Sequence, residues 1–169
     1  GSSAGITVSA PQGMVFFDDV KAKFGNTDDL QLQHDGTNSY VENITGDLYI
    51  RNKAADKSIV FQADDGSSDG SSIETYFQLE GASGGGSPFT VFPDNSVVAL
   101  GSGHDMRMLH NGSGTVFENY TGSLTLVNHA DDDDIIFRSD DGSGGVETYF
   151  YLDGSLSGGN PVTVFPDNS

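Results

Sequence analysis

The chain has 169 residues, and its 25 acidic and 7 basic side chains give a formal net charge of -18 at pH 7. This charge repels nucleic-acid phosphates and anionic lipid headgroups, so we expect neither nucleic acid nor membrane insertion. The sequence has no cysteine, which excludes disulfides, thiolate metal sites and a cysteine nucleophile. Its 23 glycines in 169 residues are about twice the usual share of about 7%. This composition favours strands and turns.

An internal repeat organises most of the chain. Residues 15–67 align without gaps on residues 91–143, at an offset of 76 positions, and 21 of the 53 pairs are identical. After a gap of three residues, the stretch ETYF at 74–77 pairs with 147–150, and TVFPDNS at 90–96 recurs at 163–169. We therefore divide the chain into a lead-in or donor segment at 1–14, a first β repeat at 15–90 and a second at 91–169.

Within the first repeat, apolar residues alternate with polar ones. Leu30, Leu32 and His34 fall on one face of an expected strand. The same period predicts strands over 47–51, 58–62 and 74–79, with about seven strands in each repeat. Glycine turns follow at 35–36, 45–46 and 65–66 and at the matching places of the second repeat. No window predicts a helix longer than two turns.

Such short, thin strands give one repeat little core of its own. The fold class we predict is all-β, with two tandem repeats of about 75 residues. The apolar faces would be covered either by sheets packed within each repeat or by identical chains that share them. The second arrangement, in which identical chains share the apolar faces, fits the composition better because the chain is rich in glycine and serine.

Four stretches carry a resemblance to a known family: FGNTDDLQLQHDGTNSY at 24–40, TGDLYIRN at 45–52, IVFQADDG at 59–66 and ETYFQL at 74–79. They resemble a repeat of tail-fibre and other virion structural proteins of marine bacteriophages. The resemblance implies an intertwined homotrimeric β fibre in the virion, whose shaft spaces a receptor-binding tip from the particle during host attachment. The second repeat departs from the pattern at 104–111.

Two histidines at matching positions are candidate ligands. His34 and His110 lie on the apolar faces of their predicted strands. Around the axis of a trimer, three neutral imidazoles could bind a transition metal or an anion. The alternative is a core histidine that hydrogen-bonds to a neighbouring carboxylate or carbonyl group.

Acidic turns are candidate calcium sites, because calcium prefers carboxylate and carbonyl oxygens. The candidates are Asp64, Asp65 and Asp69 in the first repeat and Asp140 and Asp141 in the second. They lack the spacing of an EF-hand loop, so the alternative is a turn whose aspartates bond their own backbone. The run at 131–134 points to both faces of an extended segment and cannot converge on one ion.

Nothing in the sequence assembles a catalytic group, so we expect no enzyme and no required cofactor, with a structural metal or calcium ion as an option. The expected partners are copies of the chain and adjoining fibre segments. Two alternatives remain open. One is a secreted bacterial filament or surface-layer subunit that adds residues 6–17 as a strand to the next subunit. The other is an adhesin module at the cell surface, whose tyrosines, such as Tyr49 and Tyr120, stack on host glycans.

Overall fold

The computed structural model describes residues 13–67, 72–81, 85–155 and 158–167. The described residues form strands and turns only, and none of them belongs to a helix that could cross a membrane. The all-β prediction is therefore confirmed. The proposed donor strand at 6–17 lies mostly outside the described residues, as does Asp69.

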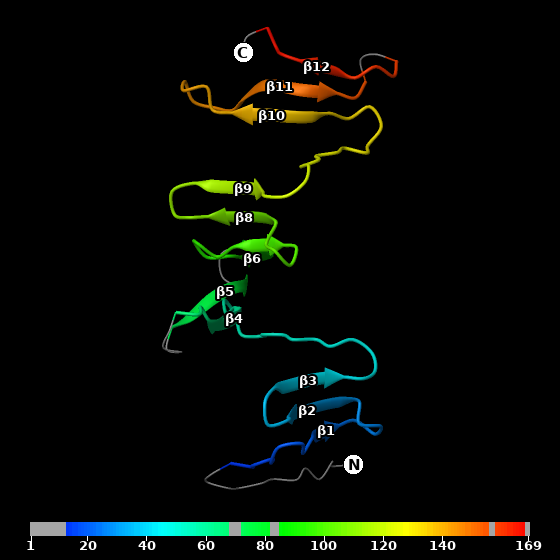
Figure 1. Ribbon diagram of the computed structural model, residues 1–169, viewed down its shortest axis with the longest axis vertical. Coiled ribbons are helices and arrows are strands. Elements are labelled where there is room, and N and C mark those ends of the chain that lie inside the picture. The colour runs from blue at the N-terminus through cyan, green and yellow to red at the C-terminus, as the bar shows by residue number, and fades with distance from the viewer. Residues whose placement is uncertain (1–12, 68–71, 82–84, 156–157, 168–169) are drawn as a thin grey trace. The chain divides into compact units, whose positions relative to one another are not determined.

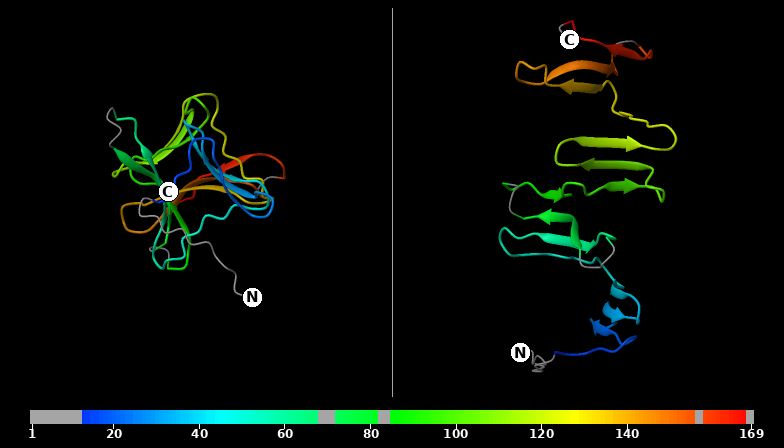
Figure 2. Two further views of the ribbon diagram at one scale, coloured as in Figure 1. Left: turned by 90° about the horizontal axis from the view of Figure 1, so that it is seen from below. Right: turned by 60° about the vertical axis from the view of Figure 1, so that its left-hand side comes forward.

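Twelve strands form four antiparallel sheets of three strands each, and every sheet joins consecutive strands of the chain (Figure 1). Figure 2 shows the four sheets from two other sides. The strands of the first and third sheets are β1 (Ala22–Phe24), β2 (Leu30–His34), β3 (Ser39–Asn43), β7 (Val98–Leu100), β8 (Met106–His110) and β9 (Thr115–Asn119). Those of the second and fourth are β4 (Ile59–Asp64), β5 (Ile73–Glu80), β6 (Phe89–Val91), β10 (Ile135–Ser139), β11 (Glu147–Asp153) and β12 (Val162–Val164).

The chain divides into two compact units, residues 1–61 with 78–91 and residues 62–77 with 92–169. The division runs through β4 and β5.

The strands at 30–34, 58–62 and 74–79 were predicted correctly, to within a residue or two at their ends. The strand predicted over 47–51 was wrong, because those residues have no strand partner in the described chain. The described residues contain six strands up to and including residue 91 and six after it, where about seven were expected in each repeat.

The turns that join β2 to β3 and β8 to β9 depend on glycine. Gly36 and Gly112 have φ of 87° and 86°, in the left-handed region that glycine enters without a steric penalty. In each turn the residue after the strand donates a backbone hydrogen bond across the loop: the amide of Asp35 donates to the carbonyl of Asn38 at 3.0 Å, and that of Asn111 to the carbonyl of Gly114 at 3.1 Å. The hairpin register that follows sets which side chains share a face.

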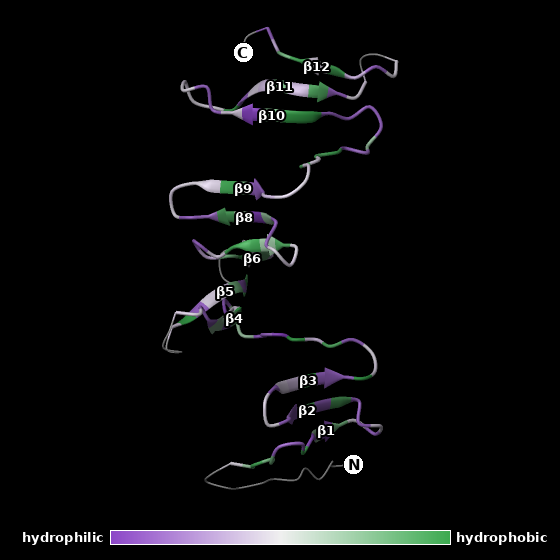
Figure 3. Ribbon diagram, viewed as in Figure 1, coloured by the Kyte–Doolittle hydropathy of each residue, from purple (hydrophilic) through white to green (hydrophobic). Residues whose placement is uncertain are grey.

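That register places the apolar residues of β2 on one face. Leu32 stands opposite Ala22 and Val41, whereas Gln31 stands opposite Lys23 and Glu42. Figure 3 shows the alternation of hydrophobic and hydrophilic residues along the strands, with β10 and β12 largely hydrophobic.

Among the described residues, no hydrophobic side chain is buried. Within each unit the described sheets therefore do not cover one another's apolar faces, as the first of the two arrangements expected from the sequence would require. The second, in which identical chains share the apolar faces, remains a prediction.

Candidate functional site

The two candidate histidines end their strands opposite a hydroxyl residue. His34 on β2 pairs with Ser39 on β3, and His110 on β8 pairs with Thr115 on β9. In both hairpins the imidazole Nδ1 lies 3.1 Å from the hydroxyl oxygen of the partner. Opposed residues of a hairpin point to the same face, so each ring is oriented by its neighbouring strand.

This contact decides what the other ring nitrogen can do. If Nδ1 carries the proton and donates it to the hydroxyl oxygen, Nε2 has a free lone pair and can bind a metal ion. If the hydroxyl donates to Nδ1, then Nε2 carries the proton and is a hydrogen-bond donor. The predicted carboxylate or carbonyl partner of a core histidine is replaced here by a hydroxyl group, and both rings are exposed.

The turn before each sheet fixes the end of the histidine strand. The amide of Asp19 donates to the carbonyl of His34, and the amide of Asn95 donates to that of His110, both at 2.8 Å. Asp19 and Asn95 adopt φ of 65° and 66°, a conformation that Asx residues tolerate better than most. The carbonyl group of each histidine is therefore bonded within its own chain.

No described group of three or more His, Asp or Glu side chains is arranged to hold a metal ion. One imidazole on each sheet is too few, because structural sites for transition metals use about four ligands. A metal site at His34 or His110 therefore needs ligands from other chains, and it stays a prediction.

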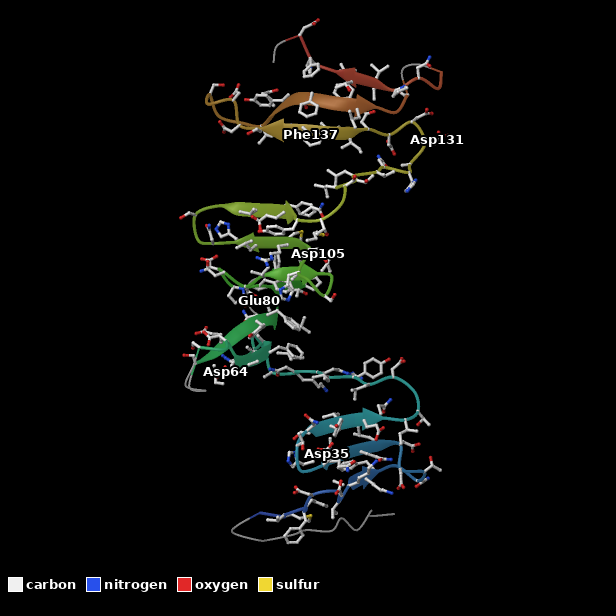
Figure 4. The ribbon with its side chains drawn as sticks, viewed as in Figure 1. Asp35, Asp64, Glu80, Asp105, Asp131 and Phe137 are labelled. Atoms are coloured by element: carbon white, nitrogen blue, oxygen red, sulfur yellow. The ribbon has the colours of Figure 1, made fainter. Side chains whose placement is uncertain are left out.

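The candidate calcium residues are engaged in their own turns. Asp64 accepts a hydrogen bond from the amide of Gly66 at 2.7 Å, and Asp140 accepts one from Gly142 at 2.6 Å. The same two residues also receive a tyrosine hydroxyl on their backbone carbonyls, from Tyr76 at 3.1 Å and from Tyr149 at 3.2 Å. These bonds match the alternative of a self-bonded turn. Figure 4 labels Asp64 at the end of its strand.

Asp65 and Asp141 each accept the amide of the serine two residues later at 2.8 Å. Hydrogen bonds from the side chain and amide of Ser67 lower the pKa of Asp65, and bonds from the amide and side chain of Ser143 lower that of Asp141. Both carboxylates are thus held in the ionised form that a cation would require, but no cation is needed to explain it.

The acidic run at 131–134 begins in a turn rather than in the extended segment that was expected. Asp132 takes the left-handed turn conformation, with φ of 60°. Asp134 accepts the amide of Gly154 on its carboxylate at 3.0 Å and the side chain of Asn128 on its carbonyl at 3.2 Å. This segment ties the loop before β10 to the end of β11.

The tyrosines proposed for sugar stacking are mostly tied by their hydroxyl groups. Tyr49, Tyr76, Tyr120 and Tyr149 donate to acidic residues or their carbonyls, as does Tyr40. An arginine guanidinium also covers one ring face of Tyr49, at 4.7 Å, and of Tyr120, at 5.0 Å. These two rings present at most one open face to a sugar.

The sequence analysis missed a polar network on β2. The ammonium of Lys21 donates to the side-chain oxygen of Gln31 at 2.7 Å and lies 3.5 Å from the carboxylate of Glu42. The side-chain amide nitrogen of Gln31 donates to the backbone carbonyl of Asp28 at 3.0 Å. Gln31 is 7% exposed, and no other residue that the structure describes is buried. Gln31 lies between Leu30 and Leu32 in the sequence, and a polar residue at such a position is not expected to be buried.

Compared with protein families, curated proteins and solved structures, the chain matches none.

Proposed function

We propose that this chain is a shaft segment of a homotrimeric bacteriophage tail fibre, which spaces a receptor-binding tip from the virion. Two β units in tandem, residues 15–90 and 91–169, form the segment, and each chain covers the apolar faces of the others. The role is structural and uses no catalytic residue. The number of chains and the viral origin rest on the resemblance of residues 24–40, 45–52, 59–66 and 74–79 to fibre repeats.

The observation that carries the proposal is the inverted burial of the sheets. On β2 the polar Gln31 is 7% exposed, whereas its apolar neighbour Leu32 is 41% exposed. On β8 and β9, the opposed pair Met108 and Phe117 is 41% and 46% exposed. A sheet that worked as a single chain would cover its apolar face first. The inversion supports the proposal that a partner covers it.

An apolar groove beside His110 offers one place for such a contact. It has a volume of about 320 Å³, and Phe92, Val98, Met108 and Phe117 contribute to its lining. Because the groove opens on the apolar face that carries the histidine, a copy of the chain seated there would bring its own side chains to His110. In a trimer, the same contact repeated around the axis would form the predicted ring of three imidazoles.

The proposal is tested by the molar mass of the protein in solution, measured by light scattering on a sizing column. A mass of three times 17.8 kDa, about 53 kDa, is expected. Leu32→Asp should release single chains, because the charge enters the covered face. Gln33→Asp, with the same charge on the opposite face of β2, is the matched control and should remain trimeric. A compact wild-type single chain would overturn the proposal.

The location is tested separately. An antibody raised against the chain should decorate the tail fibres of the parent virion in electron micrographs. Labelling of cell-surface filaments, together with heterogeneous species at the void volume of the column, would favour the filament subunit instead. Binding on a glycan array that is lost in Tyr49→Ala or Tyr120→Ala would favour the adhesin.

A further inference from the structure

Two extended segments have no backbone partner among the residues that the structure describes. Residues 47–52 connect β3 to β4, and residues 123–128 connect β9 to β10. The described part of the chain supplies no backbone hydrogen bond to residues 48–51 or 124–127. A peptide group without a protein partner must bind water or another chain. We call these two stretches the extended segments.

Both extended segments are held in place at both ends. The side-chain amide of Asn43 donates to the carbonyls of Thr45 and Gly46 at 3.0 and 2.8 Å, just before the first segment. At its far end the side chain of Asn52 donates to the carbonyl of Ser58 at 3.0 Å. The second segment is fixed in the same way by Asn119, at 2.9 and 3.0 Å, and by Asn128, at 3.2 Å. The turns at both ends of each segment are therefore fixed by side chains of the same chain, and no described strand pairs with the residues between them.

Their side chains have the pattern of a strand that covers an apolar layer. Leu48 and Ile50, which alternate with polar neighbours, are 47% and 62% exposed. In the second segment Leu124 and Leu126 take the same places and are 52% and 58% exposed. An exposed extended stretch of this kind is a template for strand addition.

We propose that each extended segment pairs as a β-strand with a sheet edge of a second copy of this chain. The two segments recur at an offset of 76 residues, so a partner that serves both must present the same edge twice. This chain does so, because strands such as β3 and β9 recur at the same offset. This inference rests on the proposed assembly of identical chains and adds how the chains are joined.

Hydrogen–deuterium exchange on the assembled protein tests the pairing. The amides of residues 48–51 and 124–127 should exchange at least about tenfold more slowly in the assembly than in chains diluted to monomers. The strands β2 and β8 serve as internal references. Trimeric protein with unprotected segments would overturn this inference alone, whereas a single-chain mass would overturn it together with the proposed function.

Proline substitutions locate the bonds. Consecutive amides of a strand point to opposite sides, so either Tyr49→Pro or Ile50→Pro must remove a donor from the partner edge. At that position the protomer concentration of half-assembly should rise at least about tenfold above that of the alanine variant, which keeps the amide. Ala55→Pro is the control, since it precedes Asp56 (φ 57°) in a turn where proline fits. Unchanged assembly in both proline variants would refute the pairing.

Discussion

Asp35 and Asn111 hold matching turns with different chemistry. Each accepts the amides two and three residues later on its side-chain Oδ1, at 2.9 and 2.7 Å for Asp35 and at 3.0 and 2.9 Å for Asn111. Only Asp35, labelled in Figure 4, is charged, and it also accepts the hydroxyl of Tyr40 at 2.9 Å. The chain thus contains a titrating turn and a neutral counterpart.

Asp35→Asn should make the protein less sensitive to acid. The amides of Asn38 and Thr37, followed by the hydroxyl of Tyr40, hold the pKa of Asp35 below its usual 3.8. The ionised form therefore adds stability above about pH 4, and this stability is lost as the pH falls through the lowered pKa of the folded state. The difference in Tm between wild type and Asp35→Asn should shrink from pH 6 to pH 2.5, measured by circular dichroism at one chain concentration.

The reverse substitution is the control. Asn111→Asp places a carboxylate before the amides of Ser113 and Gly114, so it should gain a dependence on pH of the same sign. Parallel Tm curves for wild type and both variants would show that the amide groups do not stabilise the charge.

At the scale of elements, a close approach of backbone closes the second and fourth sheets. A Cβ atom on Gly81, directly after β5, would overlap the carbonyl oxygen of Lys57, and one on Gly154, directly after β11, would overlap that of Asp133. The amides of the two glycines donate to the side chains of Ser58 and Asp134, at 3.3 and 3.0 Å. Each sheet therefore needs a residue without a side chain at this point.

Gly81→Ala should lower the free energy of unfolding by about 1–3 kcal/mol, because the backbone of Lys57 must move to admit the methyl group. Gly114→Ala is the matched control. A Cβ at Gly114 meets no atom within 4 Å, and its φ lies outside the left-handed region, so a change within about 0.5 kcal/mol is expected. Chemical unfolding at equal chain concentration measures both, and equal stability of the two variants would contradict the contact.

An aromatic column also joins the strands of the fourth sheet. The ring of Phe150 on β11 lies 4.4 Å from that of Phe137 on β10 and 5.8 Å from that of Phe165 after β12. In the second sheet Phe77 and Phe92 are 5.8 Å apart. Phe137 and Phe165 remain 39% and 68% exposed, so the column orders each sheet without covering it.

The sequence predicted the strands whose partner lies nearby in the chain. The alternation around Leu32 and around Phe77, with glycine turns beside it, is enough to define a hairpin. The same alternation at Leu48 and Ile50 failed, because a strand also requires a neighbour, which no period in the sequence supplies. Alternation likewise assigns residues to two faces without saying which face is covered, so the burial of Gln31 could not be predicted.

For the candidate sites, the position of a residue on its strand or turn was predictable, but the partner of its side chain was not always so. The sequence placed His34 on the apolar face of its strand, and the register confirms that placement. The hydroxyl partner of its ring was not predicted, because the contact depends on which residue the hairpin loop sets opposite the histidine. For Asp65 and Asp141 the alternative of a self-bonded turn already followed from the glycine that comes next.

At the scale of the whole molecule, charge opposes the proposed assembly of identical chains. Each chain carries a net charge of -18, so three chains together carry three times that, -54. The chain has 7 basic side chains against 25 acidic ones, and the ion pairs of Lys21 with Glu42 and of Lys23 with Asp28 are partly or fully open to solvent. Such pairs contribute little to stability. Assembly should therefore depend on ionic strength.

Raising sodium chloride from 0.02 to 0.5 M should lower the protomer concentration of half-assembly, because salt shortens the range of repulsion from about 20 Å to about 4 Å while apolar burial persists. Light scattering over a dilution series measures this midpoint. Calcium chloride at matched ionic strength separates screening from binding: equal midpoints indicate screening, whereas a lower midpoint in calcium that disappears in Asp65→Asn or Asp141→Asn indicates the calcium site predicted from the sequence. A midpoint that rises with sodium chloride would mean that ion pairs between chains, rather than shared apolar faces, hold the assembly together.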